Sequence, residues 1–307
     1  MSIGLPIYNG EQFIRQTLDS LRAQDCEDFE LIISDNASVD GTAAICQEYQ
    51  ARDQRIRYCR NVTNVGATGN FNRAFELSSG EFFMWAGAHD LWHPSFISRC
   101  ANVLREDKSV VLAYSRTMLV NVNGEPMEIA PDRIDTRGLS PLERYRHLIW
   151  NLKWCNLLHG VIRSSALRST GMFRDLFGPD HLLLAELSLQ GAFAQIPEPL
   201  FYRRISRPDE GADVEAWKKR ALQTLNPETS SRRGEMSLTE LFRELRNAHL
   251  RVLCRSQLGP RAKLKGIVDT IRCYESNFGV RFPDDEVIRR LLRNRIATFL
   301  TRKIFAT

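Results

Sequence analysis

The chain has 307 residues, of which 43% are hydrophobic and 26% are charged, so it is long enough to bury a sizeable core. No apolar run approaches the ~20 residues needed to span a bilayer, and no basic segment precedes an apolar run at the Met1 end. These features predict neither a transmembrane helix nor a secretion signal. The seven cysteines are odd in number and form no CxxC pair, which indicates a reducing, cytoplasmic setting in which thiols act as small apolar residues.

The net charge of +5 is unevenly distributed along the chain. Residues 1–202 carry 19 Lys/Arg against 24 Asp/Glu, whereas residues 203–307 carry 23 against 13. A basic tail beside an acidic body favours an anionic partner surface, such as phospholipid headgroups or a nucleic acid. Because the sequence contains no recognised nucleic-acid-binding module, we expect no nucleic-acid partner.

The first 115 residues alternate short apolar runs with amphipathic stretches, which predicts a mostly parallel sheet flanked by helices. The expected strands cover residues 2–8, 29–34, 56–59, 82–85 and 110–114. The expected helices between them lie around residues 14–21, 42–52 and 66–77, and from residue 94 onward.

The pattern is less regular after residue 115. Asn123-Gly124 predicts a hairpin between residues 118–120 and 127–129. A strand over 158–163, a helix over 180–190, a strand over 193–196 and an extended segment over 200–205 would complete this domain. Residues 206–236 are expected to be irregular, with a polar, basic linker at 226–234, and a basic helical extension over 237–307 begins with a capping box at Ser237.

Three polar clusters follow predicted strands, and open parallel sheets bind ligands beyond the carboxyl ends of their strands. The first cluster ends in Tyr8-Asn9, an aromatic ring and an amide that can meet a base. The second contains Asp35, whose carboxylate can accept a hydrogen bond from a ring N–H of a pyrimidine or purine. The third ends in Asp90, where a divalent ion can bridge a diphosphate.

In order and spacing, these segments resemble the signature of family 2 glycosyltransferases. The shared features are Pro-x-Tyr-Asn, Asp-Asn-x-Ser-x-Asp-Gly-Thr, Asn-x-Gly and a DxD-like triplet, over roughly residues 1–205. The resemblance implies an α/β GT-A domain over 1–205 and an inverting transfer of a sugar from a nucleoside diphosphate sugar to an acceptor hydroxyl. It also implies a role in cell-surface or envelope glycan synthesis. The residues that it places around the donor nucleotide are Pro6, Tyr8, Asn9, Asp35, Asn64, Gly66, Ala88 and His89.

The triplet Ala88-His89-Asp90 departs from the family pattern, in which two or three acids are common. Only Asp90 remains as the expected metal ligand, and Ala88 replaces the first acid. One carboxylate with phosphate oxygens and waters can hold Mg²⁺ or Mn²⁺, and an imidazole from His89 would favour Mn²⁺. His89 can equally be a structural residue.

The depleted triplet also leaves open a protein of another class, a non-catalytic nucleotide-sugar-binding or scaffold protein. A nucleotidyltransferase is a weaker alternative, because no glycine-rich, basic phosphate loop follows the first strand.

Asp180 is the expected catalytic base, because Phe177-Gly178-Pro179-Asp180-His181 resembles the family's Glu-Asp segment before a helix. A helix N-cap is the alternative role for Asp180. His159 is a candidate ligand for metal or diphosphate, with a structural histidine as the alternative. Arg203 and Arg204 resemble the basic loop that closes over the diphosphate, although a solvated basic edge has the same composition.

Residues 284–305 combine an acidic start, an apolar stripe at helical spacing and six basic residues. This composition predicts a helix on an anionic membrane surface, which would place a cytoplasmic enzyme at the inner face of the membrane near a lipid-linked or glycan acceptor. The alternative is that the stripe docks on the catalytic domain.

Overall fold

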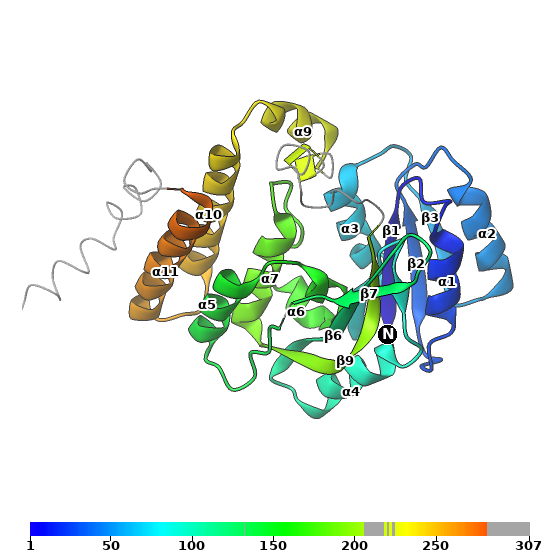
Figure 1. The fold of residues 1–307 in the computed structure, drawn as a ribbon, viewed down its shortest axis with the longest axis horizontal. Coiled ribbons are helices and arrows are strands. Elements are labelled where there is room, and N and C mark those ends of the chain that lie inside the picture. The colour runs from blue at the N-terminus through cyan, green and yellow to red at the C-terminus, as the bar shows by residue number, and fades with distance from the viewer. Residues whose placement is uncertain (132, 206–217, 220, 223–224, 281–307) are drawn as a thin grey trace, which may run out of the picture. The chain divides into compact units, whose positions relative to one another are not determined.

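The computed structural model describes residues 1–131, 133–205, 218–219, 221–222 and 225–280 (Figure 1). The chain divides into two compact units, Met1–Met236 and Ser237–Thr307. The candidate site residues all lie in the first unit.

The described part of the first unit forms a nine-stranded mixed sheet in the order β3-β2-β1-β4-β8-β6-β9-β5, with β7 paired to β6. The first four strands are parallel to one another, and β8 pairs antiparallel with both β4 and β6. The strands are β1 (Ser2–Ile7), β2 (Glu30–Asp35), β3 (Ile56–Arg60), β4 (Phe82–Trp85), β5 (Leu91–Trp92), β6 (Val110–Val120), β7 (Pro126–Ile129), β8 (Val161–Arg163) and β9 (Ala192–Arg204).

Helices cover both faces of this sheet, which explains why β1 is buried along its whole length. At the β1–β3 end, α1 and α2 lie on one side and α3 on the other (Figure 1). The helices of this unit are α1 (Ile14–Arg22), α2 (Thr42–Arg52), α3 (Gly66–Glu76), α4 (Phe96–Glu106), α5 (Pro141–Asn151), the 3-10 helix η1 (Asn156–His159), α6 (Ser164–Arg168), α7 (Pro179–Gln190) and α9 (Pro227–Gly234).

The end of β4 is held by a cluster of aromatic side chains around Trp85, which is fully buried. The indole N–H of Trp85 donates to the carbonyl of Phe71 at 2.9 Å. Phe83 and Phe173 meet the Trp85 ring edge to face, with centroids 4.9 and 5.1 Å away. The loop that carries residues 86–90 therefore starts from a tightly packed point.

The predicted strands and helices of the first 115 residues are confirmed, including a strand over residues 82–85 with those ends. The hairpin at Asn123-Gly124 is confirmed as β6–β7. The predicted strand at 110–114 was too short, because β6 continues through Val120 alongside β9. For the same reason, the two segments expected at 193–196 and 200–205 form one strand with irregular register.

Two other predictions were wrong in their local structure. The strand expected at 158–163 begins only at Val161, because residues before it form η1 and the N–H of Gly160 closes a turn onto the carbonyl of Leu157 at 3.0 Å. The linker expected at 226–234 contains α9. Polar composition alone does not exclude a short helix that packs against a domain.

The second unit contains the helical hairpin of α10 (Leu238–Arg255) and α11 (Pro260–Phe278). Ser237 forms the expected capping box with Glu240 at the start of α10. Phe242 and Phe278 stack between the two helices, with ring centroids 4.1 Å apart. The predicted amphipathic helix at 284–305 lies outside the described residues. Within the described residues, no helix is both long enough and apolar enough to cross a membrane.

Candidate active site

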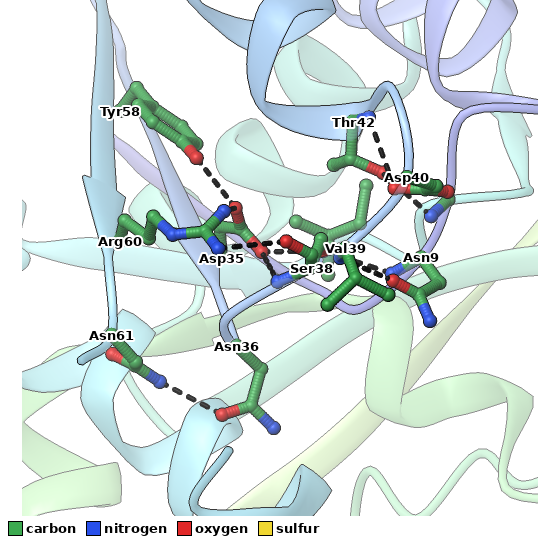
Figure 2. A network of polar contacts seen from close by, with 12 residues as sticks. Asn9, Asp35, Asn36, Ser38, Val39, Asp40, Thr42, Tyr58, Arg60 and Asn61 are labelled. Carbon is green, nitrogen blue, oxygen red and sulfur yellow. Dashed lines mark hydrogen bonds and ion pairs between the residues drawn. The ribbon is translucent and has the colours of Figure 1, made fainter. Parts of the chain in front are cut away.

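The carboxylate of Asp35, the last residue of β2, is the centre of a polar network at the ends of the parallel strands (Figure 2). Its Oδ1 accepts hydrogen bonds from the Ser38 N–H at 2.9 Å and the Ser38 hydroxyl at 2.5 Å. Its Oδ2 accepts from the Tyr58 hydroxyl at 2.5 Å and from the Arg60 guanidinium at 3.1 Å. Four donors fill the roughly four acceptor positions of a carboxylate. A base N–H can therefore reach Asp35 only by displacing one of these donors.

Arg60 is the donor that a ligand can displace. Its side chain is 44% exposed, whereas that of Asp35 is fully buried. Burial raises the pKa of Tyr58 to about 12, and its hydrogen bond to Asp35 acts in the same direction, so the phenol remains a donor at neutral pH. Tyr58 and Ser38 therefore hold the carboxylate from the protein side. Arg60, which also donates to the Ser38 carbonyl at 2.8 Å, is the exposed donor.

The loop after β1 is tied to the loop after β2 through Asn9. The N–H of Asn9 donates to the Ser38 hydroxyl, and the Asn9 side-chain oxygen accepts from the Val39 N–H, both at 2.9 Å. Asn9 has a positive φ of 50°, a conformation that Asn tolerates better than most residues. The preceding residue, Tyr8, is 50% exposed. Pro6 is buried in β1. Tyr8 is thus the member of this segment that can stack on a base.

The turn at Asn64–Gly66 is held by Asn36, a buried residue that the sequence analysis did not assign. The Asn36 amide donates to the side-chain oxygen of Asn64 at 2.8 Å and to the carbonyl of Gly66 at 3.1 Å. Its own oxygen accepts from the Val65 N–H at 2.9 Å. The signal for this role was available in the Asp35-Asn36 pair of the second cluster. Asn36 therefore holds the turn against the end of β2.

Position 66 does not accommodate a residue with a side chain in this arrangement. Its φ is 77°, and an added Cβ would lie 2.8 Å from the backbone nitrogen of Asn226.

Asp90 is buried at the end of the loop after β4. Its Oδ1 accepts from the backbone N–H of Arg204 at 2.9 Å, and its carbonyl accepts from the Thr17 hydroxyl at 2.9 Å. Its Oδ2 accepts no hydrogen bond from the described residues and lies where a Cβ on Gly87 would come within 2.4 Å. One carboxylate oxygen therefore holds the loop, and the glycine at position 87 leaves space beside the other.

Arg204 lies inside the protein. Its guanidinium donates to the carbonyl of His89 at 2.9 Å, to the Gln16 side chain at 2.6 Å and to the carbonyl of Val122, and it lies over the ring of Phe13. Burial lowers its pKa, partly offset by the nearby Asp90. The expectation that Arg204 closes over a diphosphate is thus corrected: its donors already have protein acceptors.

Arg203 lies on the opposite face of β9 from Arg204 and is partly exposed. Its guanidinium donates to the side-chain oxygen of Asn156 at 2.8 Å and lies 4.9 Å from the Trp154 ring. Arg203 remains the residue of this pair that can reach an anionic ligand.

The two histidines lie near Asp90 with different exposure. The side chain of His89 is 51% exposed, and its Nε2 is 3.7 Å from Asp90 Oδ1. His159, the last residue of η1, is partly buried, and its Nδ1 lies 3.0 Å from the carbonyl of Trp85. Because a carbonyl can only accept, Nδ1 carries the proton and Nε2 keeps its lone pair. Burial lowers the pKa of His159, so the ring is neutral at neutral pH.

Asp90 and His89 are ligand types that a divalent ion of the kind expected from the sequence can bind. Asp90 offers one carboxylate oxygen, and His89 offers an imidazole nitrogen 3.7 Å from that carboxylate. The side chains of Asp90, His89 and His159 do not all come close enough together to share one ion. An ion bound to a diphosphate needs only one or two protein ligands. The imidazole favours Mn²⁺ over Mg²⁺.

Asp180 is the second residue of α7, whose N-cap is Gly178 with a φ of 68° and whose first residue is Pro179. The alternative role of Asp180 as an N-cap is therefore wrong. The Asp180 carboxylate accepts from the His181 N–H at 2.9 Å. Cys155, a residue that the sequence analysis did not assign, lies beside both: donor atoms of Cys155, Asp180 and His181 are within 4.8 Å of one another.

Through η1, these residues join the two halves of the site. Cys155 is next to Asn156, the partner of Arg203, and His159 at the other end of η1 is near Asp90. The structure thus places Asp180 and Arg203 near the start of η1, and the other end of η1 carries His159. Among the described residues, no hydrogen bond or ion pair links Asp180 directly to the Asp35 network.

The chain is similar in sequence to known proteins. The family model for glycosyl transferase family 2 matches residues 2–177. An uncharacterised glycosyltransferase of Rickettsia bellii is 31% identical over 166 residues, which cover 52% of this chain and 23% of that protein. The Bacillus subtilis protein TuaG, named for teichuronic acid biosynthesis, is 28% identical over 128 residues, covering 42% of this chain and 50% of TuaG. The chain spans half or less of the length of these two relatives.

Two solved structures share the fold. That of S. aureus TarS 1-349 in complex with UDP-GlcNAc has a TM-score of 0.68 at 18% identity and covers 98% of this chain and 80% of TarS 1-349. That of the Pyrobaculum calidifontis mannosyltransferase PcManGT with GDP-Man and Mn²⁺ has a TM-score of 0.50 at 17% identity and covers 99% and 81%. The predicted GT-A fold, an α/β sheet domain with C-terminal helices, is confirmed. The match to the family model covers more than half of the sequence, so the chain belongs to glycosyl transferase family 2.

Proposed function

We propose that this chain is an inverting glycosyltransferase that moves a sugar from a nucleoside diphosphate sugar to an acceptor hydroxyl, in the synthesis of a cell-surface or envelope glycan. The observation that carries the proposal is the Asp35 network. A carboxylate fixed by Ser38 and Tyr58, with one displaceable donor in Arg60, lies at the ends of β1 and β2 near the exposed Tyr8. Asp35 would accept the base N–H in place of Arg60, and Tyr8 would stack on the base.

The transfer itself would use Asp180. Its carboxylate takes the proton of the acceptor hydroxyl while the acceptor oxygen forms a bond to the anomeric carbon. The bond from that carbon to the diphosphate breaks on the opposite face, and the nucleoside diphosphate leaves with the bonding electrons. The configuration at the anomeric carbon is therefore inverted. The His181 N–H holds one oxygen of Asp180, and the other would take the proton.

The residues on the diphosphate side are Asp90, His89, His159 and Arg203. Asp90, with the His89 imidazole beside it, would hold a Mn²⁺ or Mg²⁺ ion, which when bound neutralises charge on the leaving diphosphate. Arg203, beside Asn156, would add a fixed positive charge for the same oxygens. Arg204 would act indirectly by holding the loop that carries His89 and Asp90.

The donor and acceptor classes are proposed from the relatives. TarS was solved with UDP-GlcNAc and PcManGT with GDP-Man and Mn²⁺, which supports a hexose carried by UDP or GDP. TuaG is named as a putative glycosyltransferase of teichuronic acid biosynthesis, which supports a glycan or its lipid-linked precursor as acceptor. None of the seven cysteines forms a disulfide, in keeping with a cytoplasmic protein. A peripheral membrane association through residues 284–305 remains part of this proposal.

A second candidate function is a protein that binds a nucleotide sugar without turning it over. The observation that favours it is the position of Asp90, the only acid of the triplet, which is buried and already bonded to Arg204. Such a protein would retain the Asp35 pocket and bind the donor with no transfer.

The experiment that tests the proposal is a thermal-shift screen of UDP-, GDP- and dTDP-sugars with and without Mn²⁺, followed by a transfer assay with the donor that binds. A ligand that binds only the native state raises the melting temperature. Binding of one donor class together with sugar transfer supports the enzyme. Binding without transfer to any glycan acceptor supports the second candidate, and the absence of any shift would contradict both.

A further inference from the structure

Cys155, Asp180 and His181 form a cluster of three metal-ligating side chains that the proposed transfer does not require as a group. One donor atom from each side chain lies within 4.8 Å of the other two. Among the described residues, this is the group of three or more His, Cys, Asp or Glu side chains that comes close enough to share one ion. All three residues are partly buried, so an ion at this point would be only partly hydrated.

The backbone holds two of the three groups in place. Gly178, with its positive φ, and Pro179 start α7, so that Asp180 and His181 both lie in the first helical turn. The His181 N–H binds Asp180 Oδ1, which orients the carboxylate and leaves Oδ2 for another partner. No described residue makes a hydrogen bond to the His181 ring. Cys155 is the N-cap residue of η1. At the other end of η1, the N–H of Gly160 donates to the carbonyl of Leu157.

The chemistry of the three donors selects the ion. A thiolate, an imidazole and a carboxylate are the ligands of Zn²⁺, whereas Mg²⁺ prefers oxygen ligands alone. In tetrahedral zinc coordination, neighbouring donor atoms are roughly 3.5 Å apart. Donor atoms within 4.8 Å can reach that spacing by small side-chain rotations. Three protein ligands would leave a fourth position for water.

We propose that Cys155, Asp180 and His181 bind Zn²⁺, at a site separate from the Mn²⁺ or Mg²⁺ position at Asp90, and that bound Zn²⁺ inhibits sugar transfer. The inhibition rests on the proposed role of Asp180: a carboxylate that ligates zinc is not available to take a proton from the acceptor. The binding of zinc does not rest on that role. The thiol sulfur of Cys155 is what makes this site prefer Zn²⁺ over the ions expected at the diphosphate.

The binding is tested by titrating the full chain, free of other metals, with Co²⁺, which replaces Zn²⁺ and gives visible and near-ultraviolet absorption. A thiolate ligand produces a charge-transfer band that oxygen and nitrogen ligands do not. Cobalt bound at Asp90 therefore does not contribute to this band. We expect the wild type to show this band and Zn²⁺ to abolish it by displacement. Cys155→Ser should lose the band, and His181→Ala should weaken cobalt binding by at least about 10-fold.

Cys59→Ser is the matched control, because Cys59 is another partly buried thiol, on β3. It should keep the wild-type band and affinity. Circular dichroism and melting curves of each variant separate loss of a ligand from loss of the fold. A wild type with no charge-transfer band, or a band that is unchanged in a folded Cys155→Ser variant, would overturn the zinc site.

The inhibition is tested as the ratio of transfer rates with and without Zn²⁺ at saturating Mn²⁺. We expect Zn²⁺ to lower the transfer rate of the wild type at least about 10-fold and to leave the rate of Cys155→Ser nearly unchanged. Equal inhibition of both proteins would overturn the inhibitory effect. A wild type that transfers no sugar under any condition would instead count against the proposed function, and the cobalt spectra would still decide whether the zinc site exists.

Discussion

The backbone N–H of Arg204 donates to the Oδ1 of Asp90 at 2.9 Å, across 114 positions of the chain. The Arg204 guanidinium returns to the same loop and donates to the carbonyl of His89. The end of β9 therefore fixes the loop that carries the expected metal ligand. One oxygen of Asp90 accepts from the Arg204 N–H, and the other accepts no hydrogen bond from the described residues. The structural role and the proposed metal-binding role can therefore be separated by substitution.

Asp90→Asn should abolish donor cleavage while leaving the fold intact. An amide oxygen can still accept from the Arg204 N–H, but the anionic ligand is lost. Asp90→Ala should also destabilise the protein by about 1–3 kcal/mol, because the Arg204 N–H is then buried without an acceptor. Transfer assays and urea unfolding of both variants check this. Near wild-type transfer and metal response in Asp90→Asn would show that Asp90 does not bind the metal.

Asp180→Asn should lower turnover by two or more orders of magnitude, the scale of a lost general base, and leave donor affinity nearly unchanged. The amide still accepts from the His181 N–H, so α7 should start as before. Donor binding by calorimetry and steady-state turnover separate the two effects. Affinity and turnover that fall together would point to a structural role for Asp180.

Arg60→Met should leave donor binding intact or strengthen it, because the base N–H replaces the Arg60 donor on Asp35. Tyr58→Phe should weaken donor binding, because the carboxylate loses a donor that holds it in place. Donor affinities of the two variants, measured under the same conditions, provide the comparison. A large loss of affinity in Arg60→Met with none in Tyr58→Phe would mean that the base contacts Arg60 rather than displacing it.

The stability of the protein should fall as the pH drops below about 6.5, the ordinary pKa of histidine, partly because of His159. Burial lowers the pKa of His159 in the native state. Between the two pKa values the unfolded chain binds a proton that the native protein does not, so the free energy of unfolding decreases with decreasing pH.

His159→Asn, whose amide can still donate to the Trp85 carbonyl, is the variant for comparison. It should show a shallower loss of stability over that pH range. Urea unfolding of both proteins between pH 8 and pH 5 measures the difference, and identical slopes would indicate that His159 is protonated in the native state.

Truncation before Pro283 should abolish binding to anionic vesicles, because it removes the basic stretch at 284–305. Binding of the full chain should weaken as salt screens the basic residues, each worth about 1 kcal/mol near the surface. Vesicle flotation of both chains at low and high salt is the measurement. Equal flotation of the truncated and full chains, or a truncated chain that does not fold, would favour docking of the stripe within the protein.

The local pattern of the sequence was enough to predict most of the sheet. Apolar runs and turn residues are set by near neighbours, so β4 could be located at residues 82–85 and the capping box at Ser237. The strand-end motifs also placed Tyr8, Asp35 and Asp90 beyond the carboxyl ends of the strands, which lie together in a parallel sheet. Residue types and spacing were sufficient there.

Which member of a pair is buried and which is exposed was decided only by the tertiary structure. Arg203 and Arg204 look equivalent in sequence, but neighbouring strand residues point to opposite faces, and the pairing of β9 with β6 and β5 determines that Arg204 is the buried one. The partners of Asp35 are similar: the register of β2 with β3 brings Tyr58 and Arg60 to the carboxylate. Strand register is set by packing across the whole sheet, so the local hydrophobic pattern of one segment does not reveal it. Cys155 and Asp180 meet for the same kind of reason, because η1 and α7 are brought together by the fold and not by their distance along the chain.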